Sequence, residues 1–158
     1  MEPQIVTLPE RKLVGKRLVM TFAENRTPDL WRSFMPHRHE IQTSGKELIS
    51  AAVYRAGFFD AIDPNMKFEK WAAAEVSSFD SVPDDMKTLV IPPGKYAVFH
   101  YAGSAANARE VFDYIFNWWL PQSGYKIDGR PHFEILGAKY RHNDPDSEED
   151  IHIPITHK

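Results

Sequence analysis

The stretch Gly94-Lys95-Tyr96-Ala97-Val98-Phe99-His100-Tyr101-Ala102 is typical of a strand, because aromatic and β-branched side chains dominate it after a glycine. An earlier stretch carries the same residues or close replacements at one constant offset: Gly15-Lys16, then Val19, then Phe22-Ala23. Self-similarity at a fixed spacing indicates an internal repeat. Because a helical pattern and two further strand patterns follow each stretch, we predict a duplicated β-α-β-β module.

The repeat also predicts the architecture. Repeat one covers about residues 4–77 and repeat two about residues 88–155, within one domain that spans residues 1–158. The two helices are expected to end at corresponding places, Met35-Pro36 and Leu120-Pro121, because proline disfavours a continuing helix. We expect an α+β fold in which the two helices pack on a bent antiparallel sheet with a central cleft.

Hydrophobic periodicity assigns the individual elements. Strands are expected at residues 4–22, 47–55, 67–77, 95–101, 131–140 and 150–155, and Gly15 suggests a bulge or bend in the first of them. Helices are expected from Thr27-Pro28 to about Pro36 and over residues 105–120, where apolar residues recur at helical spacing.

Composition excludes several classes of function. The chain has 158 residues, no cysteine and a formal net charge of −3. Disulfides and thiolate sites are therefore excluded, and a direct nucleic-acid partner is not expected, because such binding needs a basic surface. No signal peptide is visible, and no apolar run approaches the ~20 residues that span a bilayer, so we expect a cytoplasmic protein without a membrane partner.

Motifs for cofactors and metals are missing from the sequence. We find no glycine-rich phosphate loop, no nucleophile elbow and no His-Glu-x-x-His pattern, so we expect neither a cofactor nor a metal. The acidic run at residues 144–150 has no EF-hand spacing and is interpreted as a solvated turn.

Glu134 is the most informative polar residue. It lies within Pro131-His132-Phe133-Glu134-Ile135-Leu136-Gly137, a run that otherwise indicates a buried strand. Removing an ionised carboxylate from water costs several kcal/mol or raises its pKa, so such a group needs a partner. The partner would be a cationic ligand or, in the purely structural alternative, Arg130 or Lys139 of the same chain.

Alternation along the strands predicts which side chains share a face. One set is expected to pack against the helices: Phe133, Ile135, Ile151, Ile153, Ile155, Ala97, Phe99 and Tyr101. The other set would face the cleft: His132, Glu134, Leu136, Asp150, His152, Tyr96, Val98 and His100. Trp71 is also assigned to the cleft, where its ring would suit a cation, although a core position is the alternative.

Several motifs of the second half resemble a known family. They are Ile91-Pro92-Pro93-Gly94, Trp119-Leu120-Pro121-Gln122-Ser123-Gly124-Tyr125, Pro131-His132-Phe133-Glu134 and Ile151-His152-Ile153-Pro154-Ile155. This succession resembles the GyrI-like (gyrase-inhibitor-like) small-molecule-binding domain, which also forms the effector-binding part of AraC- and MerR-type regulators.

The resemblance implies a duplicated β-α-β-β fold with an aromatic cleft for amphipathic, often cationic compounds. It also implies that Glu134 is the ligand carboxylate. The chain differs from the regulators because it begins at the first strand, without a helix-turn-helix domain. It also has His152 where the family often has Tyr or Trp, and this histidine could share a proton with Glu134.

Together these observations predict a stand-alone protein that binds small amphipathic or cationic organic molecules, such as drugs, toxins or effectors. The predicted ligand-binding residues are Glu134, Trp71, Tyr96, His152, Phe58 and His100. For Phe58, which lies in a loop, folding back onto the sheet is the alternative. Two other functions stay open: a hydrolase of strained cyclopropane-containing toxins that uses Glu134, and a protein partner of gyrase or a transcription regulator.

Overall fold

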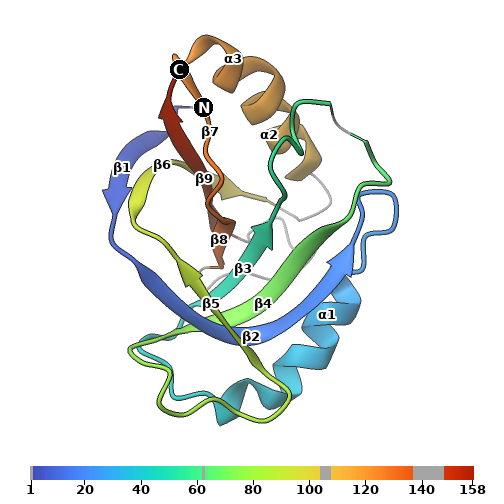
Figure 1. Ribbon diagram of the computed structural model, residues 1–158, viewed down its shortest axis with the longest axis vertical. Helices are drawn as coiled ribbons and strands as arrows, with labels where there is room; N and C mark the ends of the chain where they lie inside the picture. The colour runs from blue at the N-terminus through green and yellow to red at the C-terminus, as the bar shows by residue number, and fades with distance from the viewer. Residues whose placement is uncertain (1, 62, 104–107, 137–147) are drawn as a thin grey trace.

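Nine strands build one antiparallel sheet within residues 2–61, 63–103, 108–136 and 148–158, the ranges that the computed structural model describes (Figure 1). The order is β1-β6-β9-β8-β3-β4-β2-β5, and the short β7 pairs with β9. The strands are β1 Gln4–Leu8, β2 Arg11–Met20, β3 Leu48–Val53, β4 Phe68–Val76, β5 Lys87–Ile91, β6 Gly94–Ala102, β7 Tyr125–Ile127, β8 His132–Leu136 and β9 Glu148–His157.

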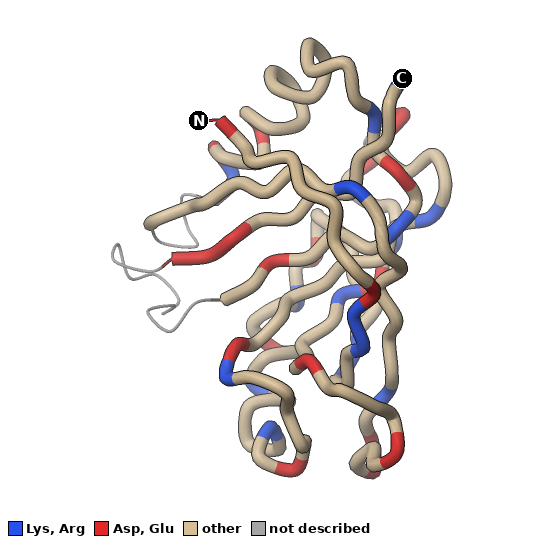
Figure 2. The backbone as a smooth tube through the Cα atoms, turned by 90° about the vertical axis from the view of Figure 1, so that its left-hand side faces the viewer, with Lys and Arg blue, Asp and Glu red and all other residues tan. Residues whose placement is uncertain are grey.

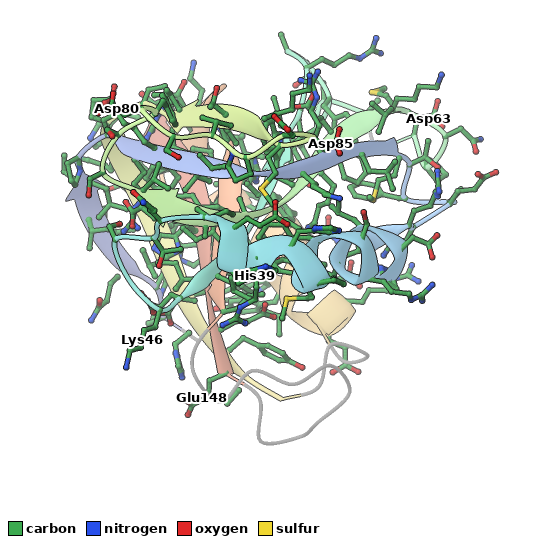
Figure 3. The ribbon with its side chains drawn as sticks, turned by 90° about the horizontal axis from the view of Figure 1, so that it is seen from below. His39, Lys46, Asp63, Asp80, Asp85 and Glu148 are labelled. Atoms are coloured by element: carbon green, nitrogen blue, oxygen red, sulfur yellow. The ribbon has the colours of Figure 1, made fainter. Side chains whose placement is uncertain are left out.

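Two helical segments pack on this sheet. The first is α1, Thr27–Phe34, continued by the 3-10 helix η1, Met35–Glu40. The second is α2, Ala108–Tyr114, continued by the π-helix η3, Ile115–Trp119, and by α3, Leu120–Gln122. Seen from below, α1 and η1 lie across the sheet, with His39 on η1 and Glu148 at the start of β9 (Figure 3). Both predicted helices are present, although residues 105–107 of the second lie outside the described ranges.

The sheet order is symmetric about the central pair β3 and β8. Reading outward, β3-β4-β2-β5 on one side mirrors β8-β9-β6-β1 on the other. The outermost strands are exchanged, because β1 pairs with β6 of the second half and β5 pairs with β2 of the first. This arrangement confirms the predicted α+β fold with two helical segments on a duplicated antiparallel sheet.

The alignment of the two repeats needs one correction. The pairing of β1 with β6 ends at Leu8 and Gly94, and the pairing of β5 with β2 ends at Ile91 and Arg11. Equivalent positions are therefore Leu8 with Ile91 and Arg11 with Gly94. Gly15 is not the counterpart of Gly94, and it forms no bulge, because the register of β2 with β4 runs through it without interruption and the register of β2 with β5 reaches it without a gap.

The two faces of the sheet carry different groups of side chains. On one, the helix face, α1 packs with Val14, Ala72 and Ala74, and α2–η3 packs with Ala97, Phe99, Ile151 and Ile153. The opposite face carries one cluster that includes Leu13, Trp71, Tyr96 and Phe133. Because this cluster joins β6 to β2, far apart in the strand order, the sheet must curve around it (Figure 1).

This division corrects part of the predicted alternation. Ala97, Phe99, Tyr101, Ile151, Ile153 and Ile155 do pack with the second helical segment, as predicted. Phe133 and Ile135, however, belong to the cluster on the opposite face. The reason is the register: Phe133 pairs with His152 and Glu134 pairs with Ile151, so Glu134, not Phe133, shares the helix face with the isoleucines.

Gly15 is required by close packing of the backbone rather than by a bend. A Cβ atom placed on Gly15 would lie 2.6 Å from Cα and 2.7 Å from Cβ of Ala73, and closer still to the backbone oxygen of Ala72. These atoms belong to β4, the hydrogen-bonded neighbour of β2, so they cannot move aside without breaking the sheet.

Gly15→Ala should therefore lower the free energy of unfolding by about 1–3 kcal/mol or more, because overpacking between two paired strands forces the backbone apart. Urea denaturation followed by circular dichroism measures the change. Gly45→Ala is the matched control, since nothing lies within 4 Å of a Cβ placed there. Equal midpoints for the two variants would contradict the role of Gly15.

Candidate functional site

A cavity of about 640 Å³ lies on the helix face, between the start of α1, the α2–η3 segment and the central strands. This volume is within the range of ligand pockets, roughly 300–1,000 Å³. Its wall is mainly aromatic and apolar: Phe22, Ala52, Tyr54, Phe59, Pro64, Phe68, Phe112, Phe116, Phe133, Ile151 and Ile153. Polar and charged residues complete it: Asn25, Thr27, Ser50, Lys70, Arg109, Asp113, Asn117, His132, Glu134 and His152.

The cavity is on the helix face because the helical segments leave the centre of the sheet uncovered. The buried cluster around α1 draws its sheet residues from β2 and β4, and the cluster around α2–η3 draws them from β6 and β9. The strands β3 and β8 lie between these two clusters. A cleft on the face away from the helices, as the alternation argument assumed, is instead filled by the Trp71–Tyr96 cluster.

Stacked aromatic rings form one wall of the cavity. Tyr54 lies at their centre, with its ring centroid 4.7–5.1 Å from those of Phe58, Phe59, Phe68 and His132. Aromatic pairs in this range gain energy beyond the area they bury. These rings meet in tilted and edge-to-face arrangements, so they hold one another in place and give the cavity an aromatic wall.

The π-helix η3 places a second aromatic surface against the first. Phe116 of η3 stacks on Phe59 at 5.1 Å and 8°, and Phe112 is parallel to Phe116 at 6.4 Å. Single-turn π segments often occur at functional sites, because the wider turn redirects side chains. Here Phe116 and Asn117, both in η3, line the cavity.

Glu134 lies in the middle of β8, half-buried on the helix face, and lines the cavity. None of the salt bridges within 4.0 Å among the described residues includes it. Arg130, one structural partner considered for it, is bound elsewhere: it donates hydrogen bonds to Asp128 and to the carbonyl oxygens of Lys95 and Ile155. The other, Lys139, lies outside the described residues.

Glu149 is a second acidic residue beside Glu134, and the sequence analysis missed it. Its side chain is hydrogen-bonded to Glu134, and it is 6% exposed. Burial, followed by the negative charge of Glu134 and this hydrogen bond, raises the pKa of Glu149. Figure 2 shows acidic positions on the neighbouring strands β8 and β9.

The prediction of a solvated turn over residues 144–150 was therefore wrong for its last part. Residues 144–147 lie outside the described ranges, but Glu148 already begins β9, and Glu149 is buried. Alternation could have found it, because Glu149 has the same parity as Ile151 and Ile153, which were correctly assigned to the helix side.

Two further titratable groups line the cavity near Glu134. Burial, and then the positive charge of Lys70, lowers the pKa of His132 to about 3, so this ring is neutral at physiological pH. Burial, and then the negative charge of Glu134, raises the pKa of Tyr54, which keeps its hydroxyl protonated. Neither residue therefore supplies a charge of its own to the cavity at neutral pH.

Trp71 and Tyr96, two of the predicted ligand-binding residues, lie on the opposite face of the sheet. Each is 1% exposed and belongs to the cluster with Leu13 and Phe133. The Tyr96 hydroxyl donates a hydrogen bond to the carbonyl oxygen of Pro131 at 3.0 Å, and the Trp71 indole donates one to Glu69 at 2.6 Å. They stabilise the fold and do not line the cavity, because their strand parity is opposite to that of Glu134.

Of the remaining three predicted residues, His152 belongs to the cavity lining, whereas His100 and Phe58 do not. His100 is exposed on the opposite face and pairs with Asp150 at 2.7 Å. Phe58 is buried behind the cavity, and its neighbour Phe59 forms the wall instead. His152 belongs to the lining, but its ring stacks on Phe133 at 4.2 Å, and burial lowers its pKa to about 4.

Comparisons with known proteins were made for the whole chain. A family model described as "integron-associated effector binding protein" matches residues 4–155. The chain belongs to this family. The match agrees with the resemblance to GyrI-like effector-binding domains, which is thereby confirmed. Within the described ranges, no helix is long and apolar enough to cross a membrane.

Members with known names are similar over nearly the entire chain. The transcriptional regulator BrlR from Pseudomonas aeruginosa is 30% identical over 156 residues, which cover 98% of this chain and 56% of the regulator. The chain thus spans about half the length of this relative.

Two solved structures show the same fold. SAV2435 bound to tetraphenylphosphonium has a TM-score of 0.69 and 17% identity, with 99% of this chain and 94% of that chain covered. The C-terminal domain of EcmrR has a TM-score of 0.71 and 15% identity, with 99% and 98% covered.

The buried His132 predicts how stability depends on acid. Its folded pKa of about 3 is below the ordinary value of 6.5, so the unfolded chain takes up a proton that the folded chain does not. Stability is therefore retained above pH 6.5 and is lost as the pH falls toward about 3. His132→Phe should reduce this slope by up to about 1.4 kcal/mol per pH unit. The part of the slope that remains in the variant should come from His152, whose pKa is also lowered by burial.

Urea unfolding at several pH values between about 4 and 7 measures the slope. Phe59→Leu is the control, because it weakens the same ring stack without removing a titrating group, so its curve should shift without changing slope. If His132→Phe leaves the slope unchanged, the ring is not held neutral by its surroundings.

Proposed function

We propose that this protein binds small organic cations that carry aromatic or apolar groups, in the cavity between α2–η3 and the central strands. The observation that carries the proposal is Glu134, a half-buried carboxylate in an aromatic cavity with no salt bridge among the described residues. A cation beside Glu134 would supply an ion-pair partner within 4.0 Å, which none of the described residues provides. The flat rings of Phe59 and Phe116 would bury its apolar part.

The energetics favour a ligand with both properties. Apolar surface contributes about 25 cal/mol per Å² removed from water, which alone gives little selectivity between compounds of similar size. A charge pair in a partly desolvated cavity adds discrimination, and the face of an aromatic ring attracts a cation further. A neutral compound of equal size would gain only the first of these terms.

The relatives support this proposal. SAV2435 is described with tetraphenylphosphonium, a bulky aromatic cation, and it shares the fold of this chain. The family description names effector binding. BrlR and EcmrR are regulators, which fits a domain whose ligand is a signal, although this chain spans only about half of BrlR.

Glu134→Gln should weaken binding of tetraphenylphosphonium about tenfold or more, because it removes the negative charge and leaves the shape of the cavity unchanged. Isothermal titration calorimetry at low salt measures the dissociation constants. Neutral triphenylphosphine oxide should bind the wild type and the variant equally weakly, because it has no positive charge to pair with Glu134 or to interact with the faces of the aromatic rings.

Glu69→Gln is the matched control for this experiment. Glu69 lies on β4 but faces away from the cavity, where it accepts a hydrogen bond from Trp71 and pairs with Arg17. Its loss of charge should leave the affinity for tetraphenylphosphonium within about twofold of the wild type, because exposed charges are screened by solvent. Equal affinities for all three proteins would remove Glu134 from the binding site.

Tyr54 beside Glu134 is the one arrangement that favours the hydrolase alternative. Glu134 could activate water as a general base, and the protonated Tyr54 hydroxyl could stabilise the developing negative charge. If the protein is a binding module, incubation with a cyclopropane-containing electrophile should yield no product by mass spectrometry. Turnover by the wild type that is lost in Glu134→Gln would instead establish the enzyme.

A further inference from the structure

Glu134 and Glu149 are diagonal neighbours on one face of the sheet. Glu134 pairs with Ile151 and Glu149 pairs with Leu136 across the β8–β9 ladder, so both side chains point to the helix face. They are joined by a side-chain hydrogen bond. Two carboxylates have only acceptor oxygens, so a hydrogen bond between them requires one shared proton.

The described charged groups around the pair do not supply the positive charge that would allow both carboxyl groups to be ionised. Among the described residues, Lys70 on β4 is the basic side chain that acts on Glu149, and its effect on the pKa is smaller than those of burial and of Glu134. His132 on β8 is neutral near pH 7 and Tyr54 stays protonated. Within the described ranges, the other titratable groups that pair with these strands or line the cavity near them are Tyr101 on β6, Arg109 and Asp113 on α2, and His152 on β9. Glu110 on α2 acts on Tyr101.

We propose that Glu134 and Glu149 form a two-carboxyl receptor that exchanges its shared proton for positive charge on the ligand, so that organic dications are preferred over monocations of the same shape. The inference rests on the proposed function, since it concerns the same cavity. It assigns to Glu149 the role of setting how much ligand charge the cavity accepts. When the ligand binds beside Glu134, which lines the cavity, the proton leaves the Glu149 carboxyl group for the solvent, and the carboxylates of Glu134 and of its buried neighbour Glu149 then balance the charge of the cation together.

The direction of the pH dependence follows from the proton count. The pKa of Glu149 is raised to about 9, so the free cavity holds the proton at neutral pH. A ligand that requires both carboxylates binds more tightly as the pH rises toward that value, by up to about tenfold per pH unit for one released proton. A ligand that needs only Glu134 gains much less over the same interval.

Methyl viologen and the N-methyl phenylpyridinium ion provide a matched test, because they have nearly the same shape and carry two charges and one charge respectively. Titration calorimetry near neutral pH in phosphate and in Tris, buffers of different ionisation enthalpy, gives the number of protons released. We expect close to one proton per viologen and clearly fewer per monocation. The affinity for viologen should also increase severalfold or more for each pH unit above neutral.

Glu149→Gln separates this inference from the proposed function. Its amide can still donate a hydrogen bond to Glu134, so the variant should fold. It should bind viologen without releasing a proton and lose the preference for the dication. Glu75→Gln is the control, because Glu75 pairs with Arg11 away from the cavity, and it should behave like the wild type.

If Glu149→Gln does not fold, the measurements on the wild type alone test whether binding releases a proton and favours the dication. Binding of both cations without proton release, and with no preference for the dication, would overturn the exchange and leave the proposed function intact. Failure of the wild type to bind either cation or tetraphenylphosphonium would overturn the proposed function and this inference together.

Discussion

Two carboxyl groups side by side on an apolar face cannot both be ionised without a counter charge, and this constraint governs the site. Coulomb repulsion and loss of water both favour the neutral form of one of them. The β8–β9 register brings Glu134 and Glu149 together, and burial together with the negative charge of Glu134 raises the pKa of Glu149, which favours the neutral form of that carboxyl group. Such a site is suited to bind cations, because a bound positive charge supplies the counter charge that two ionised carboxyl groups require.

The sheet makes this arrangement accessible to a ligand. Its two faces are used differently: the opposite face curves around Trp71, Tyr96 and Phe133 and is filled, whereas the helix face is covered only at its sides. α1 covers β2 and β4, and α2–η3 covers β6 and β9, so the central strands β3 and β8 remain open between them. The symmetric strand order thus places the acidic pair at the border of the two halves.

Much of this could be predicted from the sequence, and the errors at the site have two causes. Alternation identifies which residues share a face but not which face the helices cover. Glu134 was found because a charged residue interrupts an apolar strand, and its parity with His132 was right. Trp71 and Tyr96 were assigned to the cleft because the wrong face was taken to be open. Glu149 was missed because neighbouring acidic residues made its segment look like a turn.

The sequence by itself determined most of the strands, although not the division of residues 4–22 into β1 and β2 or the strands β5 and β7, together with the two helical segments, the duplicated topology and the isolated acidic position. These depend on local periodicity and on proline and glycine signals, which neighbouring residues encode. Only the tertiary structure decided where the cavity lies, that Glu149 lies beside Glu134, and that burial lowers the pKa of His132. Those features arise from strand register, sheet curvature and burial, which depend on contacts between residues far apart in the chain, such as Leu13 with Tyr96.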